Sequence, residues 1–343
     1  MVDAIAVELS LRSSELPPGP WQSVYFGGGT PSLLAPKQIE QLFSAALLAR
    51  GTAPEAEITL EANPDDLNLA TLAALADSPV NRLSIGVQSF READLRYMNR
   101  AHSSAEAQKC IVEARAAGFD NLTIDLIYGT PGLTDALWRE NLQRALDLGV
   151  PHISAYALTV EPRTALAHQI AKGKSQPVDE KQSARQMEIL IETLEEAGFE
   201  QYEISNFSLP GQRAIHNSNY WLGEPYLGVG PSAHSFDGTR QRSWNIANNA
   251  AYVRAISQAE LPIEREMLSD TDRYNELILT RLRTAWGLNT SDIMGVGFGQ
   301  EFRESVSPLI ARGLVSEDDG NFQITRRGRL LADHISAELF VVN

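Results

Sequence analysis

The stretch AEAQKCIVEARAAGFDNLTIDLIY, residues 105–128, decides the fold class. Its first half has apolar residues at helical spacing and stops at Gly118, a residue that suits the left-handed position just after a helix. Its second half, 121–128, is rich in β-branched and aromatic residues and predicts a buried strand. A helix that passes through a glycine into a strand is one unit of an alternating β/α fold.

The same alternation continues on both sides of this stretch, and it predicts parallel strands joined by crossover helices. Three further predicted helices are followed by a glycine in the same way: Gly51, Gly149 and Gly198. The predicted strands are 23–26, 57–61, 82–87, 121–128, 152–159 and 201–205, and the predicted helices are 36–50, 69–76, 105–117, 135–148 and 179–197.

Polar residues stand at the C-terminal end of nearly every predicted strand, among them Glu61, Gln88 and Asp125. A doubly wound sheet and a barrel both fit the alternation. In a barrel, however, these strand ends converge on one mouth, where barrel enzymes bind their ligands. We therefore expect an α/β fold, a partial (β/α)6 barrel of the TIM type, over residues 1–207.

The composition and the predicted elements change after residue 207. Residues 208–262 are rich in glycine, proline and aromatic side chains, which predicts an ordered connecting segment. Residues 263–343 predict two helices, a hairpin and a last helix. That order is typical of a winged-helix-like module, which in some proteins binds DNA and in others only packs.

Composition excludes several classes of function. The chain has 343 residues, one cysteine and a formal net charge of −15, so we expect no general binding of nucleic acid. Its first residues do not have the pattern of a signal peptide, and no apolar run of about 18 residues predicts a transmembrane segment, so we expect neither. One cysteine forms no internal disulfide, and a cytoplasmic location is expected.

The triplet Gly27, Gly28 and Gly29, followed by Thr30, comes directly after the first predicted strand. Bare backbone lets a ligand approach its N–H and C=O groups closely, although a tight turn would favour the same residues. No Gly-Lys-Ser/Thr follows, so the segment is not a P-loop.

Acidic side chains mark two of the strands. Glu61 ends the apolar run 58–60, and Asp125 interrupts the apolar strand 121–128. A carboxylate in a strand buried on both faces is costly unless it is paired, and Arg100 is a candidate partner. A ligand site and a buried structural ion pair both fit this pattern.

Two of the six histidines, His216 and His234, lie in the aromatic connecting segment. No HxH or HxxxH spacing occurs, so no protein-only zinc site is expected. A lone histidine flanked by aromatic residues, as His216 is by Tyr220 and Trp221, can ligate a haem iron. Three histidines in helices or turns are expected at the surface: His102, His168 and His334.

Seven motifs, in order along the chain, resemble one family over the whole chain. The chain is similar to radical S-adenosylmethionine (SAM) proteins of the oxygen-independent coproporphyrinogen oxidase group, and HNSNYW with the C-terminal module resembles the haem-chaperone branch. The motifs are YFGGGTPSLL at 25–34, EANPD at 61–65, RLSIGVQSF at 82–90, NRAH at 99–102, IDLIYGTPG at 124–132, ISAYALTVEP at 153–162 and HNSNYW at 216–221.

This resemblance implies cofactors and partners. Gly28, Gly29 and Thr30 would meet the methionine amino group of SAM, and His216 would be the haem-associated histidine. The implied function is a chaperone that carries haem to acceptor proteins. The alternative is the oxidase itself, which decarboxylates coproporphyrinogen in porphyrin biosynthesis. Four further residues would contact the carboxylate or the ribose of SAM: Glu61, Gln88, Arg100 and Asp125.

The chain departs from the family in one respect. Family members carry a CxxxCxxC run that holds a [4Fe–4S] cluster, and this chain has no such run. Its only thiol, Cys110, falls on a predicted helix and suits a small packed residue. The intact SAM motifs favour a chain that lacks its first strand and cluster loop over a cluster-free descendant. We expect no radical SAM activity from this polypeptide, a cluster only in a full-length parent, and no metal site here. An exposed strand edge leaves dimerisation open.

Overall fold

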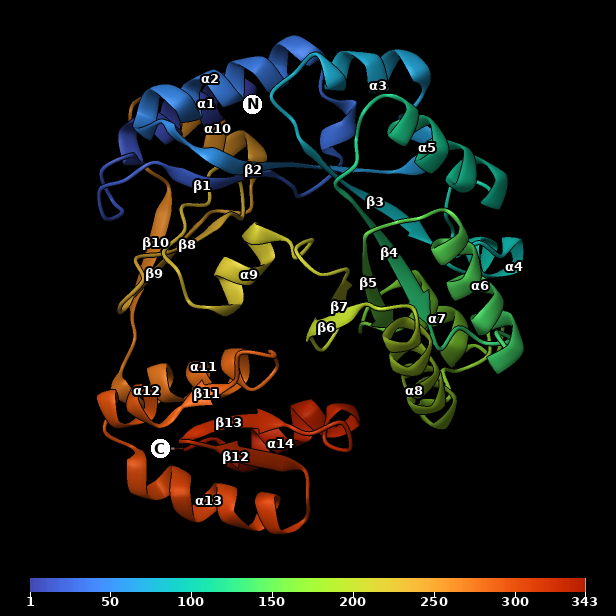
Figure 1. Cartoon of the computed structure of the whole chain (residues 1–343). Helices are drawn as coiled ribbons and strands as arrows, with labels where there is room; N and C mark the ends of the chain where they lie inside the picture. The colour runs from blue at the N-terminus through green and yellow to red at the C-terminus, as the bar shows by residue number, and fades with distance from the viewer. Residues whose placement is uncertain (343) are drawn as a thin grey trace. The chain divides into compact units, whose positions relative to one another are not determined.

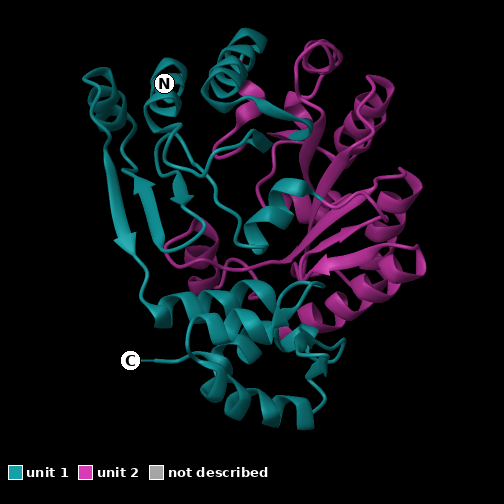
Figure 2. Cartoon of the chain, turned by 60° about the vertical axis from the view of Figure 1, so that its left-hand side comes forward, with its two compact units in different colours: residues 1–25, 35–57, 214–343 teal, residues 26–34, 58–213 magenta. Residues whose placement is uncertain are grey.

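The computed structural model describes residues 1–342 and divides into two compact units (Figure 2). Unit 1 comprises residues 1–25, 35–57 and 214–343, and unit 2 comprises residues 26–34 and 58–213. Along the described chain, no helix has the length and apolar character needed to cross a lipid bilayer. The three-part division expected from sequence, at 207/208 and 262/263, stays a prediction.

Unit 2 is built on a mixed sheet that strand β2 enters from unit 1 (Figure 1). Strands β2 to β5 pair in parallel, each with the next, as the alternating pattern predicts. The predicted sixth strand, 201–205, is observed only over 200–203, and a short strand that was not predicted, 206–208, follows it and pairs antiparallel with β5. The strands are β2 (Thr52–Ala62), β3 (Arg82–Gln88), β4 (Leu122–Tyr128), β5 (His152–Ala157), β6 (Glu200–Glu203) and β7 (Asn206–Ser208), in the order β2-β3-β4-β5-β7-β6.

Helices connect these strands and begin and end where the sequence signals lie. Asp179 caps its helix by accepting a hydrogen bond from the Lys181 N–H. Thr134 caps the helix Asp135–Asp147 by accepting a hydrogen bond from the Leu137 N–H. Gly118 and Gly198 have the positive φ expected after a helix. The helices are α3 (Leu69–Ala76), α4 (Glu92–Tyr97), α5 (Ser104–Ala116), α6 (Asp135–Asp147), α7 (Ala165–Ala171) and α8 (Glu180–Glu196), with 3₁₀ turns at Pro31–Leu33 and Pro64–Asp66.

The two faces of the unit 2 sheet differ in polarity. One face is apolar and fully buried, with Leu60, Leu83 and Ile124 at 0% exposure. Helices of the same unit pack beside this sheet, as α8 does against β4 (Figure 1). The other face carries polar side chains at paired positions: Glu61 opposite Ser84, Asp125 opposite Ser154, Ser154 opposite Asn206, and Asn206 opposite Glu203. We call these six residues the polar row.

Unit 1 contains the N-terminal helices, a small antiparallel sheet and the C-terminal module (Figure 1). Strand β1 is hydrogen-bonded to β2, and the small sheet has the order β10-β9-β8. Its elements before the module are α1 (Val2–Arg12), β1 (Trp21–Phe26), α2 (Pro36–Arg50), α9 (Ile215–Trp221), β8 (His234–Phe236), β9 (Gln241–Asn245), α10 (Asn249–Ser257) and β10 (Ile263–Met267).

A buried ion pair fixes α1 within unit 1. Glu8 and Arg12 are both 0% exposed and meet at 2.8 Å. Glu8 also accepts hydrogen bonds from the Gly230 N–H, the Asn245 amide and the Tyr252 hydroxyl. Because these groups come from the loop before β8, from β9 and from α10, one carboxylate ties α1 to three other parts of the unit.

The C-terminal module contains the two helices, the hairpin and the last helix that the sequence predicts, together with one short strand and one short helix that it does not. Its core is apolar and includes Tyr274, Phe302 and Phe322, each at most 2% exposed. The three strands form a sheet of order β11-β13-β12. The elements are α11 (Asp270–Arg281), β11 (Leu288–Asn289), α12 (Thr290–Gly295), α13 (Gly299–Ala311), β12 (Val315–Asp318), β13 (Asn321–Ile324), a 3₁₀ turn (Arg329–Leu331) and α14 (Ala332–Leu339).

Candidate functional site

A polar cavity of about 200 Å³ lies in unit 2 at the C-terminal ends of strands β2, β3 and β4. It gathers six of the seven residues expected at the SAM site, and the seventh, Gly28, is joined to it by a hydrogen bond from its N–H to Glu61 Oε2 at 3.2 Å. The lining residues are Gly29, Thr30, Pro31, Glu61, Ala62, Asn63, Ser84, Gly86, Gln88, Arg100 and Asp125.

The glycine loop after β1 contributes backbone to this cavity. Gly28 and Gly29 have φ values of +76° and +75°, which lie in the left-handed region that L side chains rarely adopt. The space around both Cα atoms is open, so conformation and not crowding selects glycine here. The loop therefore presents bare peptide groups beside the Glu61 carboxylate.

The end of strand β3 places Gln88 in the cavity by leaving regular strand geometry. The pairing of β3 with β4 shifts between Ile85 and Gln88, and Gln88 has a φ of +64°. Such a conformation is costly for a residue with a side chain and is often found at functional sites. A Cβ on Gly86 would lie 3.0 Å from Gln88 Nε2 and 3.2 Å from Arg100 Nη2. Glycine at 86 therefore leaves room for both side chains.

Arg100 is the cation of the cavity. Its Nη2 donates to Asn63 Oδ1 at 2.8 Å and to the Gly86 carbonyl at 3.4 Å. Asn63 is itself held, because its Nδ2 donates to Asp66 Oδ2 at 3.4 Å. The guanidinium is thus fixed on the cavity wall, where it can bind a carboxylate of a ligand.

Asp125 faces this cavity and belongs to the polar row, so its strand is not apolar on both faces as the sequence suggested. Burial, followed by the negative charge of Glu61, raises the pKa of Asp125 to about 7. A hydrogen bond with Ser154 and the positive charge of Arg100 both lower the pKa of Asp125, but by less than burial and Glu61 raise it. Ser154 in turn donates to Asn206 Oδ1 at 2.9 Å.

The arrangement suits a ligand of mixed charge. Glu61 and Asp125 offer carboxylates to cationic or hydroxyl groups, while Arg100 offers donors to an anionic group. Gln88 and the glycine loop add neutral donors and acceptors. A zwitterionic amino acid joined to a hydroxylated sugar has this combination of groups, and SAM is such a molecule.

Sequence reasoning did not assign a ligand role to Asn63, Ser84 or Gly86, which also line the cavity. Asn63 lies in the motif EANPD, and Ser84 and Gly86 lie in RLSIGV, so the motifs themselves marked the segments that line the cavity. The expectation that His102 is exposed is wrong. Its side chain is buried, Nε2 lies 2.9 Å from the Val87 carbonyl, and burial lowers its pKa. The imidazole of His102 therefore holds the backbone of Val87 near the end of β3.

His216 lies in unit 1, on the first turn of α9. The backbone N–H groups of Ile215 and His216 donate to the two oxygens of Glu57, each at 2.9 Å. Nδ1 of His216 lies 2.9 Å from Ser23 Oγ. The imidazole is stacked on the Tyr25 ring with centroids 4.7 Å apart and an interplanar angle of 21°.

Aromatic side chains follow His216 on and just after α9, and one of them is exposed. Tyr220 is four residues later, on the same helix face, and is 51% exposed. Its ring meets Trp221 edge-on at 5.4 Å and lies 5.6 Å from Tyr226. His234, the other histidine of this segment, lies 6.0 Å from the Trp244 ring instead. A flat apolar ligand bound through His216 would find aromatic surface beside it.

The residues present do not fit an iron–sulfur cluster. Cys110, the one cysteine, is buried in α5, its Sγ lies 3.2 Å from the Ala107 carbonyl, and burial raises its pKa to about 12. A [4Fe–4S] cluster is held by several cysteine thiolates. Over residues 1–342, His, Cys, Asp and Glu side chains nowhere form a group of three that could hold a metal ion.

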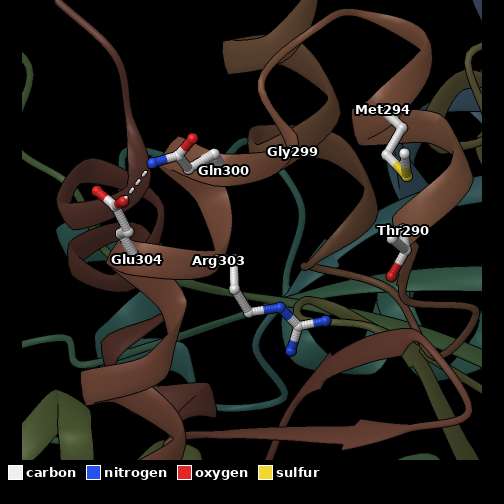
Figure 3. Close-up of a pocket in the computed structure, with 6 residues that line it drawn as sticks. All are labelled: Thr290, Met294, Gly299, Gln300, Arg303 and Glu304. Atoms are coloured by element: carbon white, nitrogen blue, oxygen red, sulfur yellow. Dashed lines mark hydrogen bonds between the residues drawn. The ribbon is translucent and has the colours of Figure 1, made fainter.

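A second, larger cavity of about 490 Å³ lies in the C-terminal module and contains none of the expected site residues (Figure 3). Its polar side chains are already engaged. Gln300 donates to Glu304 at 2.9 Å, and Arg303 forms a bidentate pair with Glu317 at 2.6 and 2.9 Å. The remaining lining is Thr290, Met294 and Gly299, which provides no acid–base chemistry.

Comparison with known proteins identifies the superfamily and the domains of the chain. The radical SAM superfamily matches residues 12–160, and the HemN C-terminal domain matches residues 268–331. Heme chaperone HemW of Mycobacterium tuberculosis is 35% identical over 97% of this chain and 84% of the relative. Heme chaperone HemW of Lactococcus lactis is 32% identical over 92% and 83%. The structure of coproporphyrinogen III oxidase (HemN) from Escherichia coli, a radical SAM enzyme, is 25% identical with a TM-score of 0.82, covering 98% of this chain and 82% of that one.

The fold and the matched domains define a radical SAM protein. Within that superfamily, the chain belongs to the family of the proteins named heme chaperone HemW.

Proposed function

We propose that this protein binds haem at His216 and carries it to acceptor proteins, and that the cavity of unit 2 binds SAM. The observation that carries the haem proposal is the His216 imidazole, held by a hydrogen bond and a stacked ring next to the exposed Tyr220. Relatives named as haem chaperones over most of this chain support the same role. Haem is the cargo here, and acceptor proteins are the expected partners.

The experiment for this role is a hemin titration followed by the Soret band. Wild-type protein is expected to give a saturable band, and His216→Ala is expected to lose it or weaken the affinity at least ten-fold. His234→Ala is the matched control, because this histidine lies in the same segment beside Trp244 and not beside Tyr25. A His216→Ala protein that titrates like the wild type would remove His216 from the proposal.

The SAM proposal uses the seven residues singled out by the sequence. The Gly28–Thr30 backbone would receive the methionine amino group, and Arg100 the carboxylate. The ribose hydroxyls would be held by Gln88, Asp125 and Glu61. When bound, SAM supplies a sulfonium group that activates its carbon substituents for transfer. The residues of this protein bind and orient it.

Calorimetric titration with SAM tests that assignment. Arg100→Lys is expected to weaken binding roughly ten-fold, because lysine keeps the charge but loses the planar fork that binds a carboxylate with two hydrogen bonds. The control is Arg139→Lys, an exposed arginine of α6 outside the cavity. Equal affinities of the wild type and Arg100→Lys would contradict the placement of the carboxylate.

The oxidase alternative is not favoured. Radical cleavage of SAM needs an electron from a cluster, and this polypeptide has one buried thiol with which to hold iron. Relatives named HemW are also more similar to the chain than the oxidase structure is, at 30–35% against 25% identity.

A further inference from the structure

Side chains of strand β1 contact the imidazole of His216 on helix α9, and the separate roles of these side chains have not been assigned so far. Ser23 and Tyr25 are two residues apart on β1, so their side chains leave the strand on the same face. Both meet His216: Ser23 through its hydroxyl at 2.9 Å from Nδ1, and Tyr25 through its ring at 4.7 Å.

The backbone of the histidine is fixed independently of its side chain. Glu57, 4% exposed on β2, accepts hydrogen bonds from the N–H groups of Ile215 and His216 with its two oxygens. This carboxylate satisfies donors at the start of α9 that have no partner within the helix. Glu57 thus holds the backbone of His216, and Ser23 and Tyr25 contact its ring.

A histidine that ligates a metal usually uses one ring nitrogen for the metal and the other for a hydrogen bond that fixes the tautomer and the ring plane. In this structure Nδ1 is the nitrogen engaged by a protein hydroxyl. An iron at Nδ1 would have to displace Ser23, whereas an iron at Nε2 would keep that contact and the Tyr25 stack.

We propose that Ser23 and Tyr25 are positioning residues for His216, which orient its imidazole so that Nε2 coordinates the haem iron while Nδ1–H donates to the Ser23 hydroxyl. This inference rests on the proposed haem-binding function and deepens it. Coordination involves donation of the Nε2 lone pair to iron, with no bond broken in the protein.

The first test compares hemin affinity among matched variants at Ser23. Ser23→Ala removes the hydroxyl and is expected to weaken hemin binding by about ten-fold, the lower end of the effect of removing a partner of a metal-bound histidine. Ser23→Thr keeps the hydroxyl in a residue that suits a strand, and it is expected to bind hemin like the wild type. Hemin affinity of Ser23→Ala within two-fold of the wild type, with His216→Ala defective, would overturn the inference and leave the haem site in place.

The second test separates the stacked ring from the tyrosine hydroxyl. Tyr25→Phe keeps the ring and is expected to titrate like the wild type, whereas Tyr25→Leu is expected to shift the Soret maximum and weaken binding several-fold. If both variants titrate like the wild type, Tyr25 does not orient the ligand.

A third measurement needs no haem. Nitrogen-15 NMR of the His216 ring in the haem-free protein is expected to show one tautomer in the wild type and in Ser23→Thr, and a mixture in Ser23→Ala. Identical ring shifts in wild type and Ser23→Ala would contradict the role of Ser23. If His216→Ala bound hemin like the wild type, the proposed function would fail at this site while these shifts still reported the contact with Ser23.

Discussion

Arg100 donates a hydrogen bond from Nη2 to Oδ1 of Asn63 at 2.8 Å, so a cation that follows α4 is held against an amide that follows β2. Asn63 is held in turn by Asp66, which also accepts a hydrogen bond from Ser32 at 2.7 Å. Three segments distant in sequence therefore determine where one guanidinium lies. Substitution of Asn63 is therefore expected to weaken ligand binding as well as to reduce stability.

Asn63→Ala is expected to weaken SAM binding by three- to ten-fold, because the hydrogen bond that orients the Arg100 guanidinium is lost. A hydrogen bond to a charged group is worth about 1.5–3 kcal/mol, of which ligand binding would show a part. Isothermal calorimetry measures the effect, with the exposed Asn249→Ala as control. Unchanged SAM affinity in Asn63→Ala would show that Arg100 is oriented by other contacts.

Gly86→Ala is expected to fold and to lose about ten-fold in SAM affinity. The new Cβ would lie 3.0 Å from Gln88 Nε2 and 3.2 Å from Arg100 Nη2, which are the ends of flexible side chains and can move away. Their movement takes two donors out of the cavity. Gly295→Ala is the control, since a Cβ there meets open space. Wild-type affinity in Gly86→Ala would mean that the two side chains need no such room.

Asp125→Asn is expected to gain stability relative to the wild type as the pH rises from 4 to 7. The carboxyl has a pKa of about 7 in the folded protein because of burial and the nearby Glu61, against about 4 when unfolded. Between these values only the unfolded chain is ionised, so the free energy of unfolding of the wild type falls as the pH rises and levels off above 7.

Urea unfolding of both proteins at pH 5, 6, 7 and 8 measures this difference directly. The comparison is needed because buried His152, whose pKa is lowered well below its ordinary value by burial, has the opposite effect. It costs stability as the pH falls below about 6.5, equally in both proteins. A difference between wild type and Asp125→Asn that does not change with pH would contradict the raised pKa.

Arg12→Met is expected to destabilise the protein by roughly 3–5 kcal/mol, because it leaves the buried Glu8 carboxylate without its cation. Three other donors would still reach Glu8, so a value near the lower end is expected. Chemical unfolding measures the loss, and Arg265→Met, which removes an exposed arginine paired with Glu15, is the control. A loss below 1 kcal/mol for Arg12→Met would show that the neutral donors suffice.

Reconstitution of this 343-residue chain with iron and sulfide is expected to give no stable [4Fe–4S] absorbance, since its single thiol is buried and its pKa is raised. Hemin binding is expected to be unaffected by an iron chelator. The measurement is the absorbance near 400 nm per chain after desalting, with acid-labile sulfide as a second readout. A stoichiometric cluster in this polypeptide would contradict the prediction.

Much of the alternation of helices and strands could be predicted from sequence because local signals agree with the fold. Pro36 at the first helical position and Gly51 after the last turn mark both ends of α2 correctly. The observed α3 likewise has the predicted bounds, 69–76. The polar residues at strand ends were found because they interrupt apolar runs. Their convergence on one cavity follows from the parallel pairing of β2, β3 and β4.

The features that could not be predicted depend on partners distant in sequence. Glu8 has the pattern of a solvent-exposed helix residue, and only Arg12 and three donors from residues 230–252 explain its burial. The β6–β7 hairpin was missed because its turn, Ile204-Ser205, has no glycine or proline to mark it. The contact of Ser23 with His216 spans 193 positions and leaves no local pattern at either end.

The polar row also has a consequence for how the sheet finds its alignment during folding. Successive residues of a strand face opposite sides, so a slip of one position in any pairing would turn Asp125 or Ser154 toward the helices and bring an isoleucine to the cavity. Each such slip would bury a carboxylate or a hydroxyl without its partner, at a cost of several kcal/mol. The polar row, of which Glu61, Ser84 and Asp125 line the ligand cavity, therefore also disfavours misaligned pairing of the strands.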